Sequence, residues 1–120
     1  MVSLHSHRYH VIVDITNIPH ERTLNKEGLE EFLNSLPGKI GMTVLNPAIV
    51  IAGVESNPGL TGFVIIDFSH CSTHTFSKYN EALVDVFSCK PYDQEELINT
   101  VLTYFEVDKR HARIKEVHWG

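Results

Sequence analysis

The chain has 120 residues, a hydrophobic fraction of 42% and a charged fraction of 21%, which are ordinary values for one compact domain over residues 1–120. Its net charge of −5 argues against a general nucleic-acid surface, because phosphate binding needs a clustered cationic face. No apolar run is long enough to span a bilayer, and the N-terminus lacks the apolar core of a signal peptide. We therefore expect a cytoplasmic protein with no membrane or nucleic-acid partner. Cys71 and Cys89 are expected as free thiols, and a disulfide between them is the less favoured alternative.

The first predicted elements are a strand and a helix. Apolar side chains alternate over residues 9–15, which predicts a strand with one strongly apolar face. Apolar residues at i, i+3, i+4 and i+7 then predict an amphipathic helix with Asn25 as its N-cap and Pro37-Gly38 as its stop. This apolar stripe consists of Leu29, Phe32, Leu33 and Leu36.

Two apolar runs follow, residues 42–54 and 60–68, separated by the turn-forming residues 55–59. The second run predicts a strand that is apolar on both faces. One face carries Leu60, Val64, Ile66 and Phe68, and the other carries Phe63 and Ile65. A strand of this kind is covered on both sides, so we expect helices on one face and the sheet of a homodimer partner on the other.

The C-terminal part predicts a strand at residues 81–89, a helix, and a short strand at residues 112–119. Asp93 and Glu96 have the spacing of a capping box at the start of this helix. The inner stripe of the helix consists of Leu97, Val101, Tyr104 and Phe105. The basic run at residues 109–115 is interpreted as a solvated edge strand. The element order predicts an α+β fold, a two-layer α/β sandwich with a mainly antiparallel sheet, which dimerises to an αββα sandwich.

His70 and His74 raise the question of a metal site. Their neighbours favour a strand, on which four residues span roughly 13 Å, too far for two ligands of one ion. No paired CxxC or HExxH spacing accompanies them. His5 and His7 could chelate an ion weakly, but a solvated terminus is the favoured interpretation. We therefore predict no metal site.

A cysteine–histidine hydrolase is a second interpretation of the same segment. Cys71 or Cys89 could pair with a histidine across strands, although no sequence signature fixes such a pair. Cysteine is more often a small buried hydrophobe than a nucleophile, and we adopt that interpretation for Cys71. A histidine on a half-buried strand is likewise more often a hydrogen-bonded structural residue than a base.

A third interpretation rests on the motif that reads Ser-His-Cys-Ser-Thr-His-Thr-Phe at residues 69–76 and Val-Asp-Val-Phe-Ser-Cys at residues 84–89. It resembles the prokaryotic S-adenosylmethionine decarboxylases, which are small pyruvoyl-dependent enzymes. Their pattern is an apolar strand, Glu-Ser-His, a few small or apolar residues, His-Thr, aromatic-Pro-Glu, a tyrosine, and Val-Asp-hydrophobic-Phe-Thr-Cys-Gly. The intervals from Ser69 to His74 and from Ser69 to Cys89 match this pattern without a gap. The first predicted strand and the order of elements agree as well.

The resemblance implies that the chain cleaves itself between Phe68 and Ser69. The Ser69 hydroxyl would attack the preceding carbonyl to give an ester, and β-elimination would release the upstream chain and leave a residue that hydrolyses to a pyruvoyl group. His74 would assist proton movement during processing, and Thr61 lies where the family often has a helping hydroxyl. The pyruvoyl cofactor derived from Ser69 would form a Schiff base with the amine of a small amino-acid-type substrate and accept electrons as carbon dioxide leaves. Cys89 would then return a proton to the substrate.

Three positions depart from the family pattern. Phe68 replaces the glutamate expected beside the reactive carbonyl and the substrate, which affects both processing and substrate binding. Lys78 replaces a glutamate that resembles a receptor for the ribose hydroxyls of the substrate, and lysine has no hydrogen-bond acceptor for them. The charge of Lys78 also disfavours a sulfonium substrate and could meet a carboxylate instead. Lys90 replaces a glycine and affects the turn after the cysteine.

Two functional hypotheses follow. The leading one is a pyruvoyl-dependent decarboxylase of S-adenosylmethionine or another amino acid, as in polyamine biosynthesis. The alternative is an unprocessed, non-catalytic homologue that acts as a binding or regulatory subunit. The intact mass distinguishes them, because only the first hypothesis produces fragments of residues 1–68 and 69–120.

Overall fold

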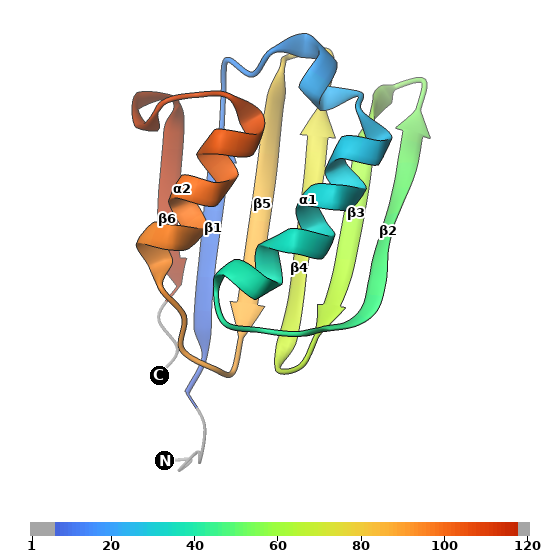
Figure 1. Ribbon diagram of the computed structural model, residues 1–120. Coiled ribbons are helices and arrows are strands. Elements are labelled where there is room, and N and C mark those ends of the chain that lie inside the picture. The colour runs from blue at the N-terminus through green and yellow to red at the C-terminus, as the bar shows by residue number, and fades with distance from the viewer. Residues whose placement is uncertain (1–6, 118–120) are drawn as a thin grey trace, which may run out of the picture.

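The computed structural model describes residues 7–117, which form two layers (Figure 1). The elements in chain order are β1 (Tyr9–Ile15), η1 (His20–Thr23), α1 (Lys26–Lys39), β2 (Val44–Val54), β3 (Asn57–Ile66), β4 (Ser69–Phe76), β5 (Glu81–Ser88), α2 (Gln94–Phe105), η2 (Lys109–His111) and β6 (Ala112–Val117). The strands pair antiparallel in one six-stranded sheet with the order β2-β3-β4-β5-β1-β6. Both α-helices lie on one face of this sheet (Figure 1). The predicted α+β two-layer sandwich with an antiparallel sheet is confirmed.

The core lies between the sheet and the two α-helices. In β1, Val11, Val13 and Ile15 are buried, and the residues between them are only partly buried, as the alternation predicted. The helices pack onto this face through Leu29, Phe32, Leu33, Leu36, Leu97, Val101 and Phe105, which are all buried. Burying one such side chain contributes about 1.5–3 kcal/mol relative to leaving it exposed. Tyr104, the remaining residue of the predicted stripe, packs at the edge of the core.

Both predicted helix N-caps are confirmed. The Asn25 side chain accepts a hydrogen bond from the N–H of Gly28 at 2.9 Å. The Asp93 side chain accepts one from the N–H of Glu96 at 3.2 Å. Each cap satisfies one of the N–H groups that the first turn of a helix leaves without a partner.

The predicted stop of the first helix at Pro37-Gly38 is wrong, because α1 continues to Lys39. Proline removes only its own N–H from the helical ladder, and its carbonyl remains available. That carbonyl accepts from the N–H groups of Ile40 at 3.1 Å and Met42 at 2.8 Å. The chain leaves the helix at Gly41, whose φ of 77° lies in the left-handed region.

The second face of the sheet, which we call the open face, is not covered by helices (Figure 1). Four large apolar side chains on it are exposed: Ile49 at 55%, Ile51 at 62%, Phe63 at 41% and Ile65 at 46%. The predicted two-sided apolar character of β3 is therefore confirmed. The placement of Phe68 on the buried face is wrong, because the turn after β3 ends the alternation and leaves Phe68 52% exposed.

Two other segments differ from their predicted bounds. The turn between β2 and β3 contains only Glu55 and Ser56, and residues 57–59 already belong to β3. The basic run begins with η2, so its edge strand starts at Ala112. The predicted strand end at Trp119 lies outside the described residues.

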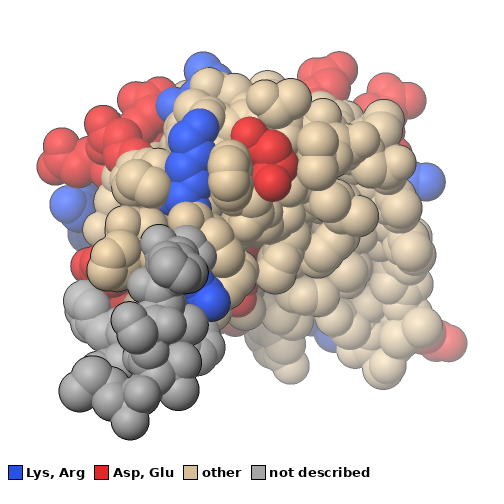
Figure 2. All heavy atoms as spheres, turned by 90° about the horizontal axis from the view of Figure 1, so that it is seen from below, with Lys and Arg blue, Asp and Glu red and all other residues tan. Residues whose placement is uncertain are grey.

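Charged side chains are dispersed on the face of the molecule that Figure 2 shows. Figure 2 views the molecule from below and shows separated basic and acidic groups among mostly uncharged residues. A basic field of the kind that binds phosphate backbones is not present on this face. No helix within residues 7–117 is long and apolar enough to cross a membrane.

Candidate active site

The predicted cleavage point lies in the turn between β3 and β4, at the lower end of the sheet in Figure 1. Ser69 is the first residue of β4 and pairs with Ser88 at the end of β5, which places Cys89 beside it. The Ser69 hydroxyl contacts the carbonyl oxygen of Phe68. The backbone N–H of Cys89 donates to Ser69 Oγ at 3.1 Å and to the Phe68 carbonyl at 3.4 Å. We call Phe68, Ser69 and Cys89 the Ser69 cluster.

The Ser69 cluster has the parts needed for attack of a hydroxyl on the preceding peptide carbonyl. Such an attack places negative charge on the carbonyl oxygen, and a fixed N–H donor stabilises that charge. The N–H of Cys89 is aimed at the oxygen of Phe68. Because this donor belongs to the main chain, it remains in place whatever side chain stands at position 89.

The segment between α1 and β2 is hydrogen-bonded to the residues around the turn between β3 and β4. The N–H of Asp67 donates to the Thr43 carbonyl at 3.0 Å, and the Thr43 N–H donates back to Asp67 Oδ1 at 3.2 Å. The Lys90 ammonium donates to the Gly41 carbonyl at 2.7 Å. The Lys90 N–H donates to Ser88 Oγ at 2.9 Å. Asp67 and Lys90, which flank the Ser69 cluster, are therefore both hydrogen-bonded to main-chain groups of the segment between α1 and β2.

Thr61 and His74 form a second group, on the open face. They are cross-strand partners in the register of β3 and β4. Thr61 Oγ1 lies 3.0 Å from His74 Nδ1. We call these two residues the open-face pair. The hydroxyl orients the imidazole, and an oriented imidazole is suited to proton transfer near neutral pH.

The structure does not bring Ser69 and His74 together within one chain. They stand five positions apart on β4, roughly 17 Å at the rise of a strand. Ser69 lies in the row of Ile66 and Ser88, whose side chains are buried, whereas His74 lies in the row of Thr61. Successive side chains of a strand point to opposite faces, so an odd spacing separates the two residues.

The two residues predicted to contact substrate are also apart. Phe68 lies in the turn before β4, and Lys78 lies in the turn after it. Both side chains are exposed. Because β4 has eight residues and spans roughly 26 Å, one chain does not gather Phe68 and Lys78 into one binding site.

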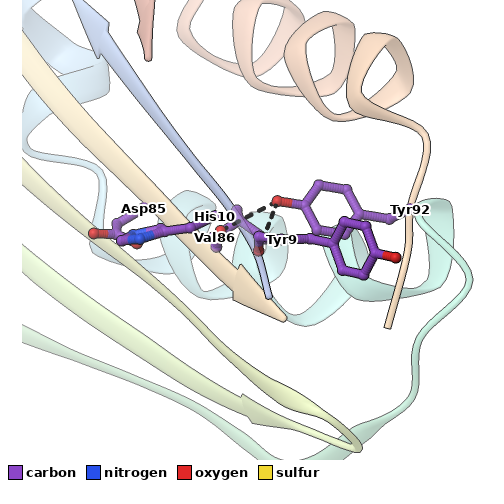
Figure 3. Close-up of polar contacts among 5 residues, drawn as sticks. All are labelled: Tyr9, His10, Asp85, Val86 and Tyr92. Carbon is purple, nitrogen blue, oxygen red and sulfur yellow. Dashed lines mark hydrogen bonds and ion pairs between the residues drawn. The ribbon is translucent and has the colours of Figure 1, made fainter. Parts of the chain in front are cut away.

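A polar pair on the open face carries no signal in the sequence. His10 Nε2 lies 2.7 Å from Asp85 Oδ1, across the pairing of β1 with β5 (Figure 3). Phe87 packs edge to face against His10, with ring centroids 5.5 Å apart, and stacks on His70 at 5.6 Å. His10 and Asp85 are 75 positions apart in the chain, so only the strand register reveals this contact.

Figure 3 also shows Tyr92, which reaches the main chain of two strands. Its hydroxyl donates to the Val86 carbonyl at 3.2 Å and to the Tyr9 carbonyl at 3.4 Å. Burial raises the pKa of Tyr92 above its ordinary value, so the hydroxyl stays protonated and remains a donor. Tyr92 fixes the segment before α2 against the ends of β1 and β5.

Cys71 does not have the environment of a nucleophile. Its side chain is fully buried in the core, and burial raises the pKa of the thiol to about 12. A hydrolase built on Cys71 would therefore lack a thiolate. Both cysteines are free thiols. Within residues 7–117, no group of three or more His, Cys, Asp or Glu side chains is arranged to hold a metal ion.

Two hollows lie outside the Ser69 cluster. One of about 330 Å³ is lined by Ile12, Asp14, Leu83, Arg113, Ile114 and Lys115. It adjoins the open-face pair, because Leu83 is the cross-strand partner of His74. The other, of about 710 Å³, lies between α1 and α2 on the helical side of the molecule.

Comparisons with known proteins agree with this architecture. The family profile described as S-adenosylmethionine decarboxylase matches residues 9–118. The S-adenosylmethionine decarboxylase proenzyme of Thermodesulfovibrio yellowstonii is 31% identical over 81 residues, which cover 67% of this chain and 57% of that protein. The proenzyme of Prochlorococcus marinus is 27% identical over 103 residues, with coverage of 86% and 80%. The match thus spans little more than half the length of the first of these relatives.

A solved structure shows the same fold. The crystal structure of the adenosylmethionine decarboxylase from Aquifex aeolicus VF5 matches with a TM-score of 0.76 and 19% sequence identity. The match covers 96% of this chain and 92% of that chain. Because the family profile also extends over almost the whole sequence, the chain belongs to the S-adenosylmethionine decarboxylase family.

Proposed function

We propose that this chain is a pyruvoyl-dependent decarboxylase that acts on S-adenosylmethionine or another amino acid after cleaving itself between Phe68 and Ser69. The observation that carries the proposal is the Ser69 cluster, in which a hydroxyl, the carbonyl before it and a main-chain N–H meet. Membership of the family supplies the class of reaction. We propose that residues 1–120 act as one domain in the cytoplasm, a compartment that keeps both thiols reduced.

Self-cleavage begins with addition of Ser69 Oγ to the carbonyl carbon of Phe68. The N–H of Cys89 stabilises the charge on the carbonyl oxygen. Breaking the C–N bond moves the acyl group from nitrogen to oxygen and gives an ester. Loss of the Cα proton of residue 69 then breaks the Cβ–O bond and expels the Phe68 carboxylate. Addition of water and loss of ammonia leave a pyruvoyl group at position 69.

Proton movement in these steps is assigned to the open-face pair. His74 carries the proton, and Thr61 orients its imidazole through the 3.0 Å contact. Because Ser69 and His74 lie on opposite faces of β4, this role requires the turn before β4 to move Ser69 toward the open face and a second copy of the chain to bring its own pair there.

The residues around position 69 fit the cofactor that would form there, since the serine that gives rise to it already contacts the carbonyl oxygen of the peptide group to be cut. A pyruvoyl group supplies a carbonyl that accepts electrons as carbon dioxide leaves a substrate. Cys89 stands beside position 69 and would return a proton to the substrate carbon that has lost its carboxylate.

Substrate recognition is assigned to Phe68 and Lys78, which lie at opposite ends of β4 and so would contact one substrate only if they come from different copies of the chain. The exposed Phe68 ring offers an apolar contact beside the cleavage point. Lys78 offers a cation that favours a substrate carboxylate and disfavours a sulfonium group. An amino acid with a second carboxylate therefore remains a candidate substrate alongside S-adenosylmethionine.

We propose that two copies pack their open faces together into an αββα homodimer. The four exposed apolar side chains on β2 and β3 support this arrangement, because an exposed apolar patch of this kind marks an interaction surface. The open-face pair and the hollow beside it would then lie between the two sheets.

The alternative is an uncleaved, non-catalytic relative that acts as a binding or regulatory subunit. The separation of Ser69 from His74 within one chain favours this alternative. It predicts an intact chain that assembles with an active decarboxylase and releases no carbon dioxide by itself.

A decarboxylation assay tests the proposal. Purified protein is incubated with carboxyl-labelled S-adenosylmethionine, ornithine, arginine, aspartate or glutamate, and the released carbon dioxide is trapped. We expect release from one substrate, complete loss of it in Ser69→Ala, and full retention in the control Ser72→Ala, which alters a serine on the same strand. Absence of release from every one of these substrates by an uncut chain would instead support the alternative.

A further inference from the structure

Lys90 connects three segments around the cleavage turn. Its ammonium donates to the Gly41 carbonyl at the end of α1, at 2.7 Å. The same ammonium lies 5.7 Å from the centroid of the Phe68 ring. Its N–H donates to Ser88 Oγ at 2.9 Å, which fixes its backbone at the end of β5. One side chain thus reaches from β5 to both the helix end and the turn.

Phe68 is the least restrained residue of that turn. Asp67 before it has two hydrogen bonds to Thr43, and Ser69 after it begins the ladder of β4. Phe68 itself is 52% exposed. Its carbonyl accepts from the N–H of Cys89 at 3.4 Å, which is a long hydrogen bond. Its carbonyl also meets the Ser69 hydroxyl, and a contact to the Phe68 side chain adds a restraint that neither of these supplies.

The Lys90 ammonium supplies that contact. A cation within about 6 Å of an aromatic ring is attracted to the face of the ring. The bond to Gly41 holds the ammonium in position, so the cation–ring contact restrains the Phe68 side chain and the backbone that carries it. The positive charge also favours the negative charge that develops at Phe68, first on its carbonyl oxygen and then on the carboxylate expelled from the ester.

We propose that Lys90 is a positioning residue for self-cleavage, which holds Phe68 so that its carbonyl stays between Ser69 Oγ and the N–H of Cys89. The inference rests on the proposed self-cleavage. It gives a role to the exposed Phe68 ring and to the lysine that follows the cysteine, two of the three positions that depart from the family pattern. Lys90 acts through Phe68 and takes no part in bond making itself.

The test uses cleavage kinetics of newly made chains. The full chain is synthesised in a cell-free system, the reaction is stopped at intervals, and the cut fraction is measured by intact mass. We expect Lys90→Met, which keeps the length and removes the charge, to slow cleavage about tenfold. Lys90→Arg restores a cation and should cleave within about twofold of wild type. The control Lys109→Met removes a lysine from η2 and should cleave at the wild-type rate.

A second measurement separates this inference from the proposed function. In a Ser69→Ala background, which cannot cleave, exchange of the Cys89 amide hydrogen is followed by NMR. We expect faster exchange when Lys90→Met is added, and wild-type protection with Lys90→Arg. If the wild-type chain stays uncut, the proposed function fails, and the exchange rates still decide the role of Lys90. Equal exchange with and without Lys90→Met, or a cleavage defect that arginine does not restore, would overturn the inference.

Discussion

The Ser69 cluster and the open-face pair each have one residue on β4, and they differ in what holds them. The Ser69 cluster is assembled by main-chain groups, the Phe68 carbonyl and the Cys89 N–H, around one hydroxyl. The open-face pair is a contact between the side chains of Thr61 and His74 on the uncovered face of the sheet. The fold of one chain therefore places the proposed nucleophile against its target, whereas the proposed acid–base residue depends on what covers the open face.

The proposed cleavage therefore has two separate structural requirements. The pairing of β4 with β5 places the nucleophile against its carbonyl. Proton transfer is proposed to use His74, which the alternation of β4 points away from Ser69. Variants that change one group and spare the other can therefore show which requirement limits the protein.

The largest effect is expected from His74→Ala. Loss of a general acid–base residue should slow self-cleavage about 10³-fold, since such groups typically contribute 10²–10⁴-fold. The measurement is the cut fraction of newly synthesised chains against time. Thr61→Val, which removes only the orienting hydroxyl, should slow cleavage about tenfold. Wild-type rates in both variants would show that the open-face pair has no part in processing.

The next largest effect is expected from Cys89→Ala, which should change self-cleavage and carbon dioxide release to different extents. Self-cleavage should continue near the wild-type rate, because the N–H that faces Phe68 belongs to the main chain. Carbon dioxide release by the cut enzyme should fall about 10²-fold, because the thiol that returns the proton is lost. Parallel measurement of intact mass and labelled carbon dioxide checks both. Equal loss of self-cleavage and of carbon dioxide release would contradict a role for the main-chain N–H of Cys89 in self-cleavage.

A smaller change is expected in association. Ile65 on the open face is 46% exposed, and Leu24 between η1 and α1 is 45% exposed, so Leu24→Glu is a matched control for Ile65→Glu. A charge buried between two sheets is costly, and Ile65→Glu should raise the dissociation constant of the dimer at least about tenfold. Sedimentation at micromolar concentration measures this. A wild-type chain that sediments as a monomer would contradict the αββα dimer.

The smallest predicted effect is on alkaline stability. Burial raises the pKa of Cys71 from an ordinary 9.0 to about 12, so the folded state favours the protonated thiol. The stability from this thiol is fully present below about pH 9 and is lost as the pH rises towards 12. Urea unfolding of wild type and Cys71→Val at several pH values should show a weaker decline in the variant. An identical decline would assign the alkaline sensitivity to other groups.

Local patterns in the sequence predicted most of the fold. Asn25 and Asp93 cap their helices as expected, since a cap depends only on the next few residues. Alternation identified the strands and the two apolar faces of β3. Alternation failed at Phe68, because β3 ends at Ile66 and the turn that follows does not continue the alternation of faces. The helix-stop signal at Pro37 also failed, because the hydrogen bonds accepted by the carbonyls of the last helical turn outweigh the one missing N–H.

The candidate site was only partly accessible to sequence reasoning. The spacing of Ser69 and Cys89 suggested a shared site, and the register of β4 with β5 places them side by side. The odd spacing of Ser69 and His74 on one strand already indicates opposite faces, but the family motif groups the two residues without regard to strand alternation. The contacts of His10 with Asp85 and of Lys90 with Gly41 join residues far apart in the chain. Such contacts follow from strand pairing and helix packing, which no local pattern encodes.

The intact mass of the purified wild-type protein tests the central claim most directly. Self-cleavage predicts two fragments, residues 1–68 and residues 69–120, the second with a blocked N-terminus. Ser69→Ala should give one uncut chain of 13.6 kDa. A wild-type protein that also remains a single 13.6 kDa chain would contradict the account.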